Sequence, residues 1–488
     1  MKDTIKQTAV RGGVLTLSAQ LFRLLANLGA TAVIARILSP DDYGLIAMVM
    51  IAASYLALFR EMGLSAATIQ KEDLTDAQTN SMFWINAVIG CLLTALTVAI
   101  APVLSALYHE PKVAPLAIWI AICFALGGLS VQHRALLRRH LRFGALAAVD
   151  ILRPVVSVTV GIGMALSGAG VWSLVGMHIA GWSAETVGLW LACPWRPGRP
   201  ALAEGTRKMV SFGGYLTGFN LLNYFARNAD KILIGRLCGA TPLGLYAKAY
   251  ELLVMPLWLI NTPMSSVAIP TLSKLQSDPV RYRRAFGKAM MVITYMTTPI
   301  TVVLAVLSME IISLLLGDQW LDSVRIFRVL AVVALGQPVA GATGWVFVSL
   351  GRGRRMFLWA LISVPCYVAS FAIGIHWGVM GVAVAYAICE QALRWPLLLF
   401  AYHGTPIRIR DLIAACWRPF GLSLVGGLVM IAVRAGLLIH TTAGPVMRIT
   451  LVVASAMLFS AVVLLISQAF RRDVRELVDY RHCLGGTR

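Results

Sequence analysis

Long apolar runs, separated by short polar and basic segments, recur along almost the whole chain. Each run is about 20 residues long, which is the length that an α-helix needs to cross the hydrocarbon core of a bilayer. No long polar stretch interrupts the series. The pattern therefore predicts an all-α polytopic membrane protein with about 14 transmembrane helices. Their predicted limits are 12–35, 44–67, 82–107, 113–132, 145–167, 171–193, 209–235, 243–268, 288–316, 325–350, 356–376, 378–402, 412–438 and 445–468.

The composition fits a surface that faces lipid. Apolar residues make up 58% of the 488 residues and charged residues 13%, and the mean hydropathy is +0.77, whereas soluble domains carry about 25% charged residues. The net charge is +20, but the basic residues lie in short loops between apolar runs, so we expect no nucleic-acid partner. The basic N-terminus leads into a long apolar run without a small-residue cleavage signature. We therefore expect a retained first helix and not a removed signal peptide.

The loops also predict an orientation. Alternate segments, starting with the N-terminus, hold 27 Lys and Arg residues, and the opposite set holds about five. Because basic loops stay on the cytoplasmic side, both termini are predicted to be cytoplasmic. The loops 133–144, 194–208, 269–288 and 351–355 belong to the same side.

Two parts of the chain resemble each other at an offset of 200 residues. Ile34-Ala35-Arg36-Ile37 matches Ile234-Gly235-Arg236-Leu237, and Gly44-Leu45 matches Gly244-Leu245. Each repeat holds six predicted helices, and an even number keeps both copies in the same orientation. We therefore expect two parallel six-helix lobes and two extra C-terminal helices around a central cavity, where transporters commonly bind substrate. The predicted parts are 1–200 (first lobe), 201–405 (second lobe), 406–470 (additional helices) and 471–488 (cytoplasmic tail).

Polar side chains form a stripe along one face of the first predicted helix and another along the seventh, its repeat partner. A cation at mid-depth costs about 2.5–3.5 kcal/mol, so such stripes need an explanation. One interpretation is a water-filled cationic cavity that binds substrate, and the other is a structural network in which Arg227 pairs with Asp230. The stripe residues, spaced by three or four positions, include Gln20, Arg23 and Asn27 on the first helix and Asn220, Tyr224, Arg227 and Lys231 on the seventh.

Other charged residues inside the apolar runs have simpler explanations. Arg60, near the inner end of the second helix, fits a position at the membrane interface. Three pairs stand one helical turn apart, where opposite charges can neutralise each other. They are Asp150 with Arg153, Lys248 with Glu251, and Glu390 with Arg394.

Glu185 and Glu310 have no partner within one turn. A buried unpaired carboxylate can titrate near neutral pH, so either residue is a candidate for proton coupling.

No catalytic signature is present. The sequence lacks a GxxxxGK[ST] phosphate loop, the HExxH and GxSxG motifs, CxxC pairs and clustered histidines. We therefore expect no enzyme activity, no metal and no cofactor. Energy for transport would come from an ion gradient or from the gradient of the substrate itself.

Several short motifs resemble a known family. They are Leu38-Ser39-Pro40-Asp41-Asp42-Tyr43-Gly44-Leu45, Gly63-Leu64-Ser65-Ala66-Ala67-Thr68-Ile69-Gln70-Lys71-Glu72-Asp73-Leu74-Thr75, Phe83-Trp84-Ile85-Asn86, Gly170-Val171-Trp172-Ser173-Leu174-Val175, Trp195-Arg196-Pro197, Asp230-Lys231-Ile232-Leu233-Ile234-Gly235-Arg236, Gly244-Leu245-Tyr246 and Gly351-Arg352. Over roughly residues 5 to 400 the chain is similar to the polysaccharide-exporter branch, the Wzx-type flippases, of the multidrug/oligosaccharidyl-lipid/polysaccharide (MOP) superfamily.

The resemblance implies a fourteen-helix fold in a bacterial inner membrane. It also implies movement of an undecaprenyl-diphosphate-linked repeat unit from the cytoplasmic to the periplasmic leaflet, with polysaccharide polymerase and export proteins as further partners. Family flippases carry cations on helices one, two, seven or eight, which here hold Arg23, Arg60, Arg227 and Lys248. Arginine binds phosphate through two parallel hydrogen bonds.

Three alternatives stay open. A multidrug efflux antiporter would favour twelve helices and acidic cavity residues. A flippase for the peptidoglycan lipid precursor shares the helix count and the cationic cavity, although the motifs look more like the polysaccharide branch. A non-transporting scaffold of a polysaccharide synthase complex would leave the buried cations hard to justify.

Overall fold

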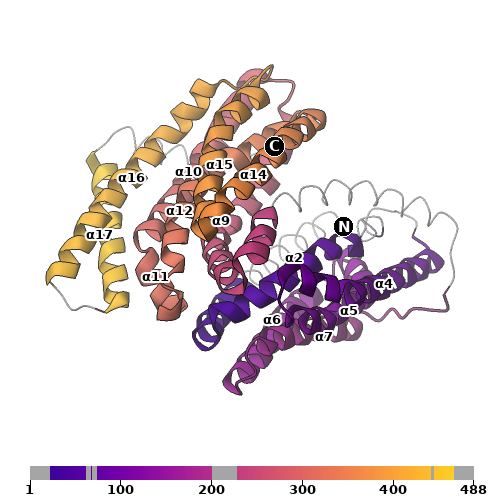
Figure 1. Ribbon diagram of the computed structural model, residues 1–488. Helices are drawn as coiled ribbons and strands as arrows, with labels where there is room; N and C mark the ends of the chain where they lie inside the picture. The colour runs from indigo at the N-terminus through magenta and orange to yellow at the C-terminus, as the bar shows by residue number, and fades with distance from the viewer. Residues whose placement is uncertain (1–21, 62–67, 69–73, 201–227, 441–443, 467–488) are drawn as a thin grey trace. The chain divides into compact units, whose positions relative to one another are not determined.

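The computed structural model describes residues 22–61, 68, 74–200, 228–440 and 444–466. Within these ranges every regular element is helical, which confirms the predicted all-α class. Nine helices there are long and apolar enough to cross a membrane, or ten if a bent pair counts as one span. The fold agrees with a count of about 14, which stays a prediction because 12–21 and 201–227 lie outside the described residues. The chain divides into two compact units, Met1–Gly244 and Leu245–Arg488 (Figure 1).

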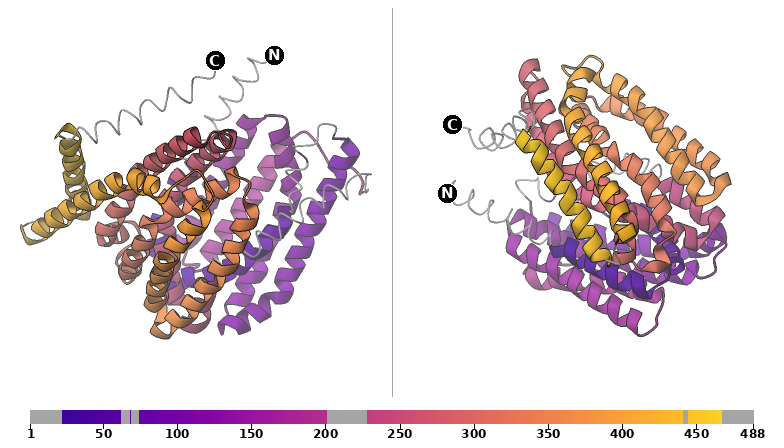
Figure 2. Two further views of the ribbon diagram at one scale, coloured as in Figure 1. Left: turned by 90° about the horizontal axis from the view of Figure 1, so that it is seen from above. Right: turned by 90° about the vertical axis from the view of Figure 1, so that its left-hand side faces the viewer.

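The first unit is built from long helices that lie side by side (Figure 2, left). Two further stretches, 22–37 and 228–238, are also helical. The helix pairs α4/α5 and α6/α7 pack most extensively, and α5 also packs against α7 and α2. Among its described residues the long helices are α2 (Pro40–Glu61), α4 (Asp76–Tyr108), α5 (Val113–Arg139), α6 (Phe143–Leu166) and α7 (Trp172–Ala192).

Glycines let α4 and α5 approach closely. A Cβ at Gly90 would lie 2.7 Å from the carbonyl oxygen of Phe124, and one at Gly128 would lie 2.6 Å from that of Asn86. Lipid tails are as apolar as leucine side chains, so helices in a membrane associate through close packing of this kind. Larger residues at either position would separate the two helices.

The ends of α4 and α5 have defined caps. At the start of α4, Thr75 accepts from the backbone N–H of Gln78, whose side chain in turn accepts from the backbone of Thr75. At the end of α5, the Arg142 N–H donates to the Leu137 carbonyl and the Leu141 N–H donates to the Arg138 carbonyl, at 2.9 and 3.1 Å. This turn places Leu141 at a φ of 55°, a left-handed conformation that helix ends usually assign to glycine.

The predicted loop at 133–144 is therefore wrong in its extent. The helix α5 continues to Arg139, and only the short turn before Phe143 separates it from α6. The physical reason is the apolar segment Ala135–Leu137, which is buried and keeps the helix packed for another turn. At 27 residues, α5 is about 40 Å long, which exceeds the hydrocarbon thickness.

The repeat-related glycines Gly44 and Gly244 meet within the first unit. The first residues of α9 (Ala240–Lys274), up to Gly244, belong to this unit. A Cβ at Gly44 would lie 1.8 Å from the carbonyl oxygen of Ala240, and a Cβ at Gly244 would lie 1.9 Å from that of Pro40. The contact is reciprocal, because Pro40 and Ala240 are also 200 residues apart. Thr241 adds a hydrogen bond to Asp41, at 3.1 Å and the same offset.

The second unit holds the rest of α9 and eight more α-helices. Its core contains the buried side chains of Tyr282, Phe286, Met290, Trp345 and Tyr402. The helix α16 packs against α10 and α17, and α15 packs against α14 and α12. The further helices are α10 (Pro279–Val306), α11 (Ser308–Leu315), α12 (Ser323–Leu335), α13 (Gln337–Ser349), α14 (Gly353–Gly374), α15 (Gly378–Tyr402), α16 (Ile409–His440) and α17 (Pro445–Ile466), with 3-10 turns at Asp318–Trp320 and Ile375–Trp377.

Two predicted spans of this unit are interrupted. The span predicted at 288–316 breaks at Leu307, where α10 ends and α11 begins. The span predicted at 325–350 bends by 41° at Gly336, between α12 and α13. Apolar periodicity alone does not reveal either break, because apolar residues predominate on both sides of each break.

Replacing Gly44 or Gly244 with alanine is expected to destabilise the protein by about 1–3 kcal/mol, because the new methyl group meets a backbone carbonyl that cannot rotate away. Thermal aggregation of the purified protein in detergent measures the effect. The matched control is Gly163→Ala in α6, where nothing lies within 4 Å of the added Cβ. Equal melting temperatures for Gly44→Ala and Gly163→Ala would contradict the reciprocal contact.

Candidate functional site

A cluster of charged side chains joins three helices of the first unit. At its centre is Glu185 of α7, with only 6% of its side chain exposed. Arg134 of α5 donates to one Glu185 oxygen at 2.9 Å, and Arg153 of α6 donates to the other. Arg134 also donates to Asp150 of α6 at 2.9 Å. Both carboxylates are thus neutralised by arginines, which is what burial of charge requires.

Trp182 extends this cluster to a fourth helix. The guanidinium carbons of Arg153 and Arg60 lie 4.3 and 4.4 Å from the centroid of its ring, a distance at which a cation is attracted to the π face. Trp182 and Glu185 are three residues apart on α7, so both face the same neighbours. We call Arg60, Arg134, Asp150, Arg153, Trp182 and Glu185 the arginine–tryptophan cluster.

The cluster carries more positive than negative charge. Three arginines stand against two carboxylates, so its formal charge is +1. The side chain of Arg153 remains 38% exposed and that of Asp150 30%, whereas Glu185 is buried beneath them. The cluster therefore combines neutralised carboxylates with a partly exposed arginine side chain, and it can both tie the four helices together and attract an anion.

These contacts correct two sequence-based interpretations. Asp150 and Arg153 do not form the expected local pair; Asp150 binds Arg134, and Arg153 binds Glu185. Glu185 lacks a partner only within its own helix, since both of its partners come from other helices. The proposal that an unpaired Glu185 couples to protons thereby loses its basis.

Arg134 was the residue that sequence reasoning missed. Arg134 falls within the predicted loop at 133–144, and a basic residue in a loop needs no partner. The sequence did contain one signal. Glu185 and Glu310 lie in apolar runs without a partner in the same helix, and a carboxylate inside a membrane requires a cation from elsewhere in the bundle.

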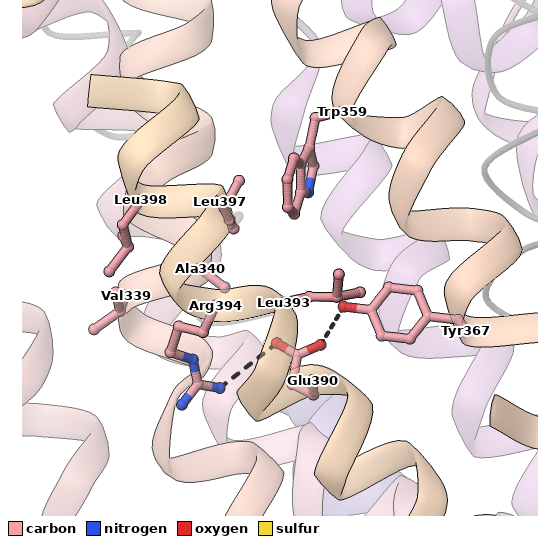
Figure 3. A pocket seen from close by; sticks show the side chains of 9 residues that line it. All are labelled: Val339, Ala340, Trp359, Tyr367, Glu390, Leu393, Arg394, Leu397 and Leu398. Carbon is pink, nitrogen blue, oxygen red and sulfur yellow. Dashed lines mark hydrogen bonds and ion pairs between the residues drawn. The ribbon is translucent and has the colours of Figure 1, made fainter. Parts of the chain in front are cut away.

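In the second unit, Glu390 and Arg394 of α15 form the predicted i,i+4 pair, at 3.6 Å. Figure 3 shows Glu390 between Arg394 and Tyr367 of α14, whose hydroxyl donates to it. These side chains line a cavity of about 10 Å³, about the space that one water needs. The Arg394 guanidinium lies over Gly336, at the bend between α12 and α13, and a Cβ there would come within 1.8 Å of it.

Two more buried charges are neutralised in the second unit. Lys248, which is 8% exposed, forms the expected pair with Glu251 at 2.8 Å. Glu310 of α11 is bonded by Arg434 of α16 at 2.5 Å, so it too is paired through a distant part of the chain. The first ion pair joins neighbouring turns of α9, and the second joins α11 to α16.

The remaining stripe residues are described only in part. Arg23 and Asn27 are both exposed on the helical stretch 22–37, one turn apart. Lys231 is half-buried, and its Nζ lies 3.5 Å from the Asn228 side chain. The other predicted stripe residues, Gln20, Asn220, Tyr224 and Arg227, lie outside the described residues.

Comparison with known proteins identifies the family. A family model described as "Polysaccharide biosynthesis protein" matches residues 33–325, which is more than half of the chain. The protein belongs to this family. The resemblance to the polysaccharide-exporter branch is thereby confirmed.

Individual relatives agree with this assignment. The chain is 22% identical to the lipopolysaccharide biosynthesis protein WzxC of Escherichia coli (strain K12), over 86% of each chain. It is 28% identical to the teichuronic acid biosynthesis protein TuaB of Bacillus subtilis (strain 168), over 67% of this chain and 68% of TuaB. These relatives are bacterial, and with its many apolar helices the chain is a multi-pass protein of the bacterial inner membrane.

A solved structure shares the fold. The lipid II flippase MurJ, in an inward closed conformation, superposes with a TM-score of 0.70 at 15% identity, over 93% of this chain and 99% of MurJ. At this identity the likeness concerns the fold alone.

Changing Glu185 to Gln is expected to destabilise the protein by about 3–5 kcal/mol, because Arg153 loses its buried counter-charge. The amount of monodisperse protein after heating measures this. Glu110→Gln, the same chemical change in the turn between α4 and α5, is the control and should have little effect. Adding Arg153→Gln to Glu185→Gln should restore part of the stability, because cation and anion then leave together. A double variant no better than the single one would argue against the ion pair.

Proposed function

We propose that this protein flips an undecaprenyl-diphosphate-linked oligosaccharide repeat unit from the cytoplasmic to the periplasmic leaflet, during the synthesis of exopolysaccharide, capsule or O-antigen. The observation that carries the proposal is the family match over residues 33–325, together with relatives named for the synthesis of lipopolysaccharide and teichuronic acid. The fold shared with a lipid II flippase supports a transport role.

The chemistry of the membrane-embedded side chains fits such a substrate. A diphosphate is a multivalent anion, and arginine binds phosphate oxygens with paired charge-assisted hydrogen bonds. The arginine–tryptophan cluster offers Arg153, whose side chain is partly exposed, and Arg23 is exposed on its helix. Asn27 on the same face could hydrogen-bond sugar hydroxyls.

We propose nine residues as substrate ligands, on the basis of their polar stripes and helix positions. Of these, Arg60 belongs to the arginine–tryptophan cluster and Lys248 is engaged by Glu251. Lys248 would therefore have to exchange a carboxylate for a phosphate on binding. The nine are Gln20, Arg23, Asn27, Arg60, Asn220, Tyr224, Arg227, Lys231 and Lys248.

The alternatives receive less support. A multidrug efflux antiporter and a flippase for the peptidoglycan precursor would share the fold, but the relatives over most of the chain are named for other polysaccharides. A scaffold without transport activity would not need the exposed Arg23 on a helix of the bundle. A polysaccharide polymerase and export proteins remain proposed partners.

We also propose that both termini are cytoplasmic and that the chain consists of two six-helix lobes, 1–200 and 201–405, followed by additional helices at 406–470 and a tail at 471–488. The orientation rests on the excess of Lys and Arg in alternate loops. The lobes rest on the 200-residue repeat, whose two copies of the glycine motif touch each other.

In cells that depend on this protein for a surface polymer, Arg23→Ala is expected to reduce polymer export at least tenfold and to leave the protein level unchanged, because the side chain is exposed. Arg23→Lys should retain partial export, since the charge survives and the planar fork does not. Export and protein level are measured together by glycan and membrane immunoblots. Arg36→Ala, an exposed arginine about 20 Å further along the same helix, is the control. Full export by Arg23→Ala would remove Arg23 from the proposed site.

The orientation predicts opposite labelling before the start of α5 and at the start of α6. Cysteines introduced at Lys112 and Gly144, both exposed, should react with a membrane-impermeant maleimide from the periplasmic and the cytoplasmic side respectively. A variant without the native cysteines provides the background. Labelling of both sites in intact cells would contradict the topology.

A further inference from the structure

A cavity of about 540 Å³ opens in the first unit where α5 ends and α4 and α6 begin. Its lining combines basic and apolar side chains. Arg139 is the last residue of α5, and His140 and Arg142 come from the turn that follows, while Leu136 and Trp195 provide part of the apolar wall. None of these residues belongs to the arginine–tryptophan cluster, and the flipping mechanism proposed above does not use them.

The electrostatics of the cavity favour an anion. Arg139 and Arg142 carry fixed positive charges, and Asp76, at the start of α4, is the acidic residue in the described lining. The N-terminus of α6 adds the positive end of a 24-residue helix, and no side chain caps it. His140 and Arg142 are exposed, so a ligand can reach them.

The wall opposite the basic turn is held in place. The indole N–H of Trp84 donates to the Gly198 carbonyl at 2.9 Å, and the Asn80 side chain donates to the Arg199 carbonyl at 2.5 Å. Trp195 packs edge-on against Phe83. These contacts assign a structural role to the motifs Phe83-Trp84 and Trp195-Arg196-Pro197, which the proposed function does not use. The two motifs fix the segment after α7 across the end of the helical bundle.

The apolar part of the lining selects among anions. Inorganic phosphate or a nucleotide would leave the accessible side chains of Leu74, Pro194 and Trp195 against water, whereas a lipid would cover them with its first methylene groups. The cavity also lies at the ends of long transmembrane helices, at the depth where lipid head groups are found. The neighbouring Leu141, which is 45% exposed between basic residues, suits the same interface.

We propose that this cavity binds the phosphate of an anionic lipid, with Arg139 and Arg142 contacting the phosphate oxygens and the apolar wall contacting the chain next to them. Two lipids carry this chemistry in the membrane of such a cell: an anionic glycerophospholipid and the polyprenyl diphosphate that anchors a glycan. Binding of either kind does not depend on the proposed flipping activity.

The test is a lipid-binding measurement on the purified full-length protein in detergent. Bound phosphatidylglycerol and phosphatidylcholine with matched chains are quantified by native mass spectrometry. The wild-type protein should prefer phosphatidylglycerol, and Arg139→Gln with Arg142→Gln should lower its affinity about 25-fold, at about fivefold for each positive charge. Arg142→Gln alone, which leaves the hydrogen bond from Arg139 to the Thr68 carbonyl intact, should give about a fivefold loss.

Two further variants separate the cavity from general charge and from misfolding. Arg281→Gln with Arg284→Gln removes two exposed positive charges from α10 in the second unit and should leave binding unchanged. Asp76→Asn removes the exposed acidic group of the cavity and should tighten binding about fivefold, a gain that a misfolded protein would not show. Equal losses in the two double variants, or no effect of Asp76→Asn, would overturn the proposal.

A competition experiment distinguishes the two lipid sources. If polyprenyl diphosphate displaces phosphatidylglycerol, the cavity accepts the anchor of the transported glycan. If phosphatidylglycerol stays bound, the cavity is a site for bulk lipid. Failure of the wild-type protein to prefer either lipid over phosphatidylcholine would overturn the site, and it would leave the export results for Arg23 untouched.

Discussion

A charged side chain inside a bilayer needs a counter-charge, and this requirement organises the first unit. Glu185 is buried in α7, and the two arginines that neutralise it come from α5 and α6. Removing Glu185 would leave Arg153 without its counter-charge in a medium of low polarity, so the ion pairs hold the three helices in one relative arrangement. Glycine contacts between α4 and α5, and between the starts of α2 and α9, complete this packing.

The same requirement separates structural from substrate-binding charges. Glu185, Glu310 and Glu390 are each engaged by an arginine, and such pairs hold helices together whether or not a substrate is present. Arg23 differs, because it is exposed on its helix, and Arg153 belongs to both groups, because it binds Glu185 while 38% of its side chain remains exposed. A transporter of a diphosphate-linked lipid needs guanidinium groups of this second kind, placed within a bundle that the first kind keeps rigid.

Contacts within one helix could be predicted from the sequence, and contacts between distant helices could not. Lys248 with Glu251 and Glu390 with Arg394 follow from helical spacing, and both pairs are present. Arg134 and Glu185 are 51 residues apart, and the sequence around each residue does not indicate the other as its partner. The 200-residue repeat identified Gly44 and Gly244 as equivalents, but only the three-dimensional structure shows that they touch. The bend at Gly336 was not predicted for a related reason. The space beside this glycine holds the Arg394 guanidinium, which comes from another helix.

The central claim is that this chain moves a lipid-linked oligosaccharide between leaflets. The most direct test is reconstitution of the purified protein into liposomes that contain a polyprenyl-diphosphate oligosaccharide, with a membrane-impermeant glycosidase added outside. If the claim holds, the protein will make the inner-leaflet glycan accessible to the enzyme far faster than in protein-free liposomes. An accessible fraction that stays at the protein-free level, in vesicles shown to contain folded protein, would contradict the account.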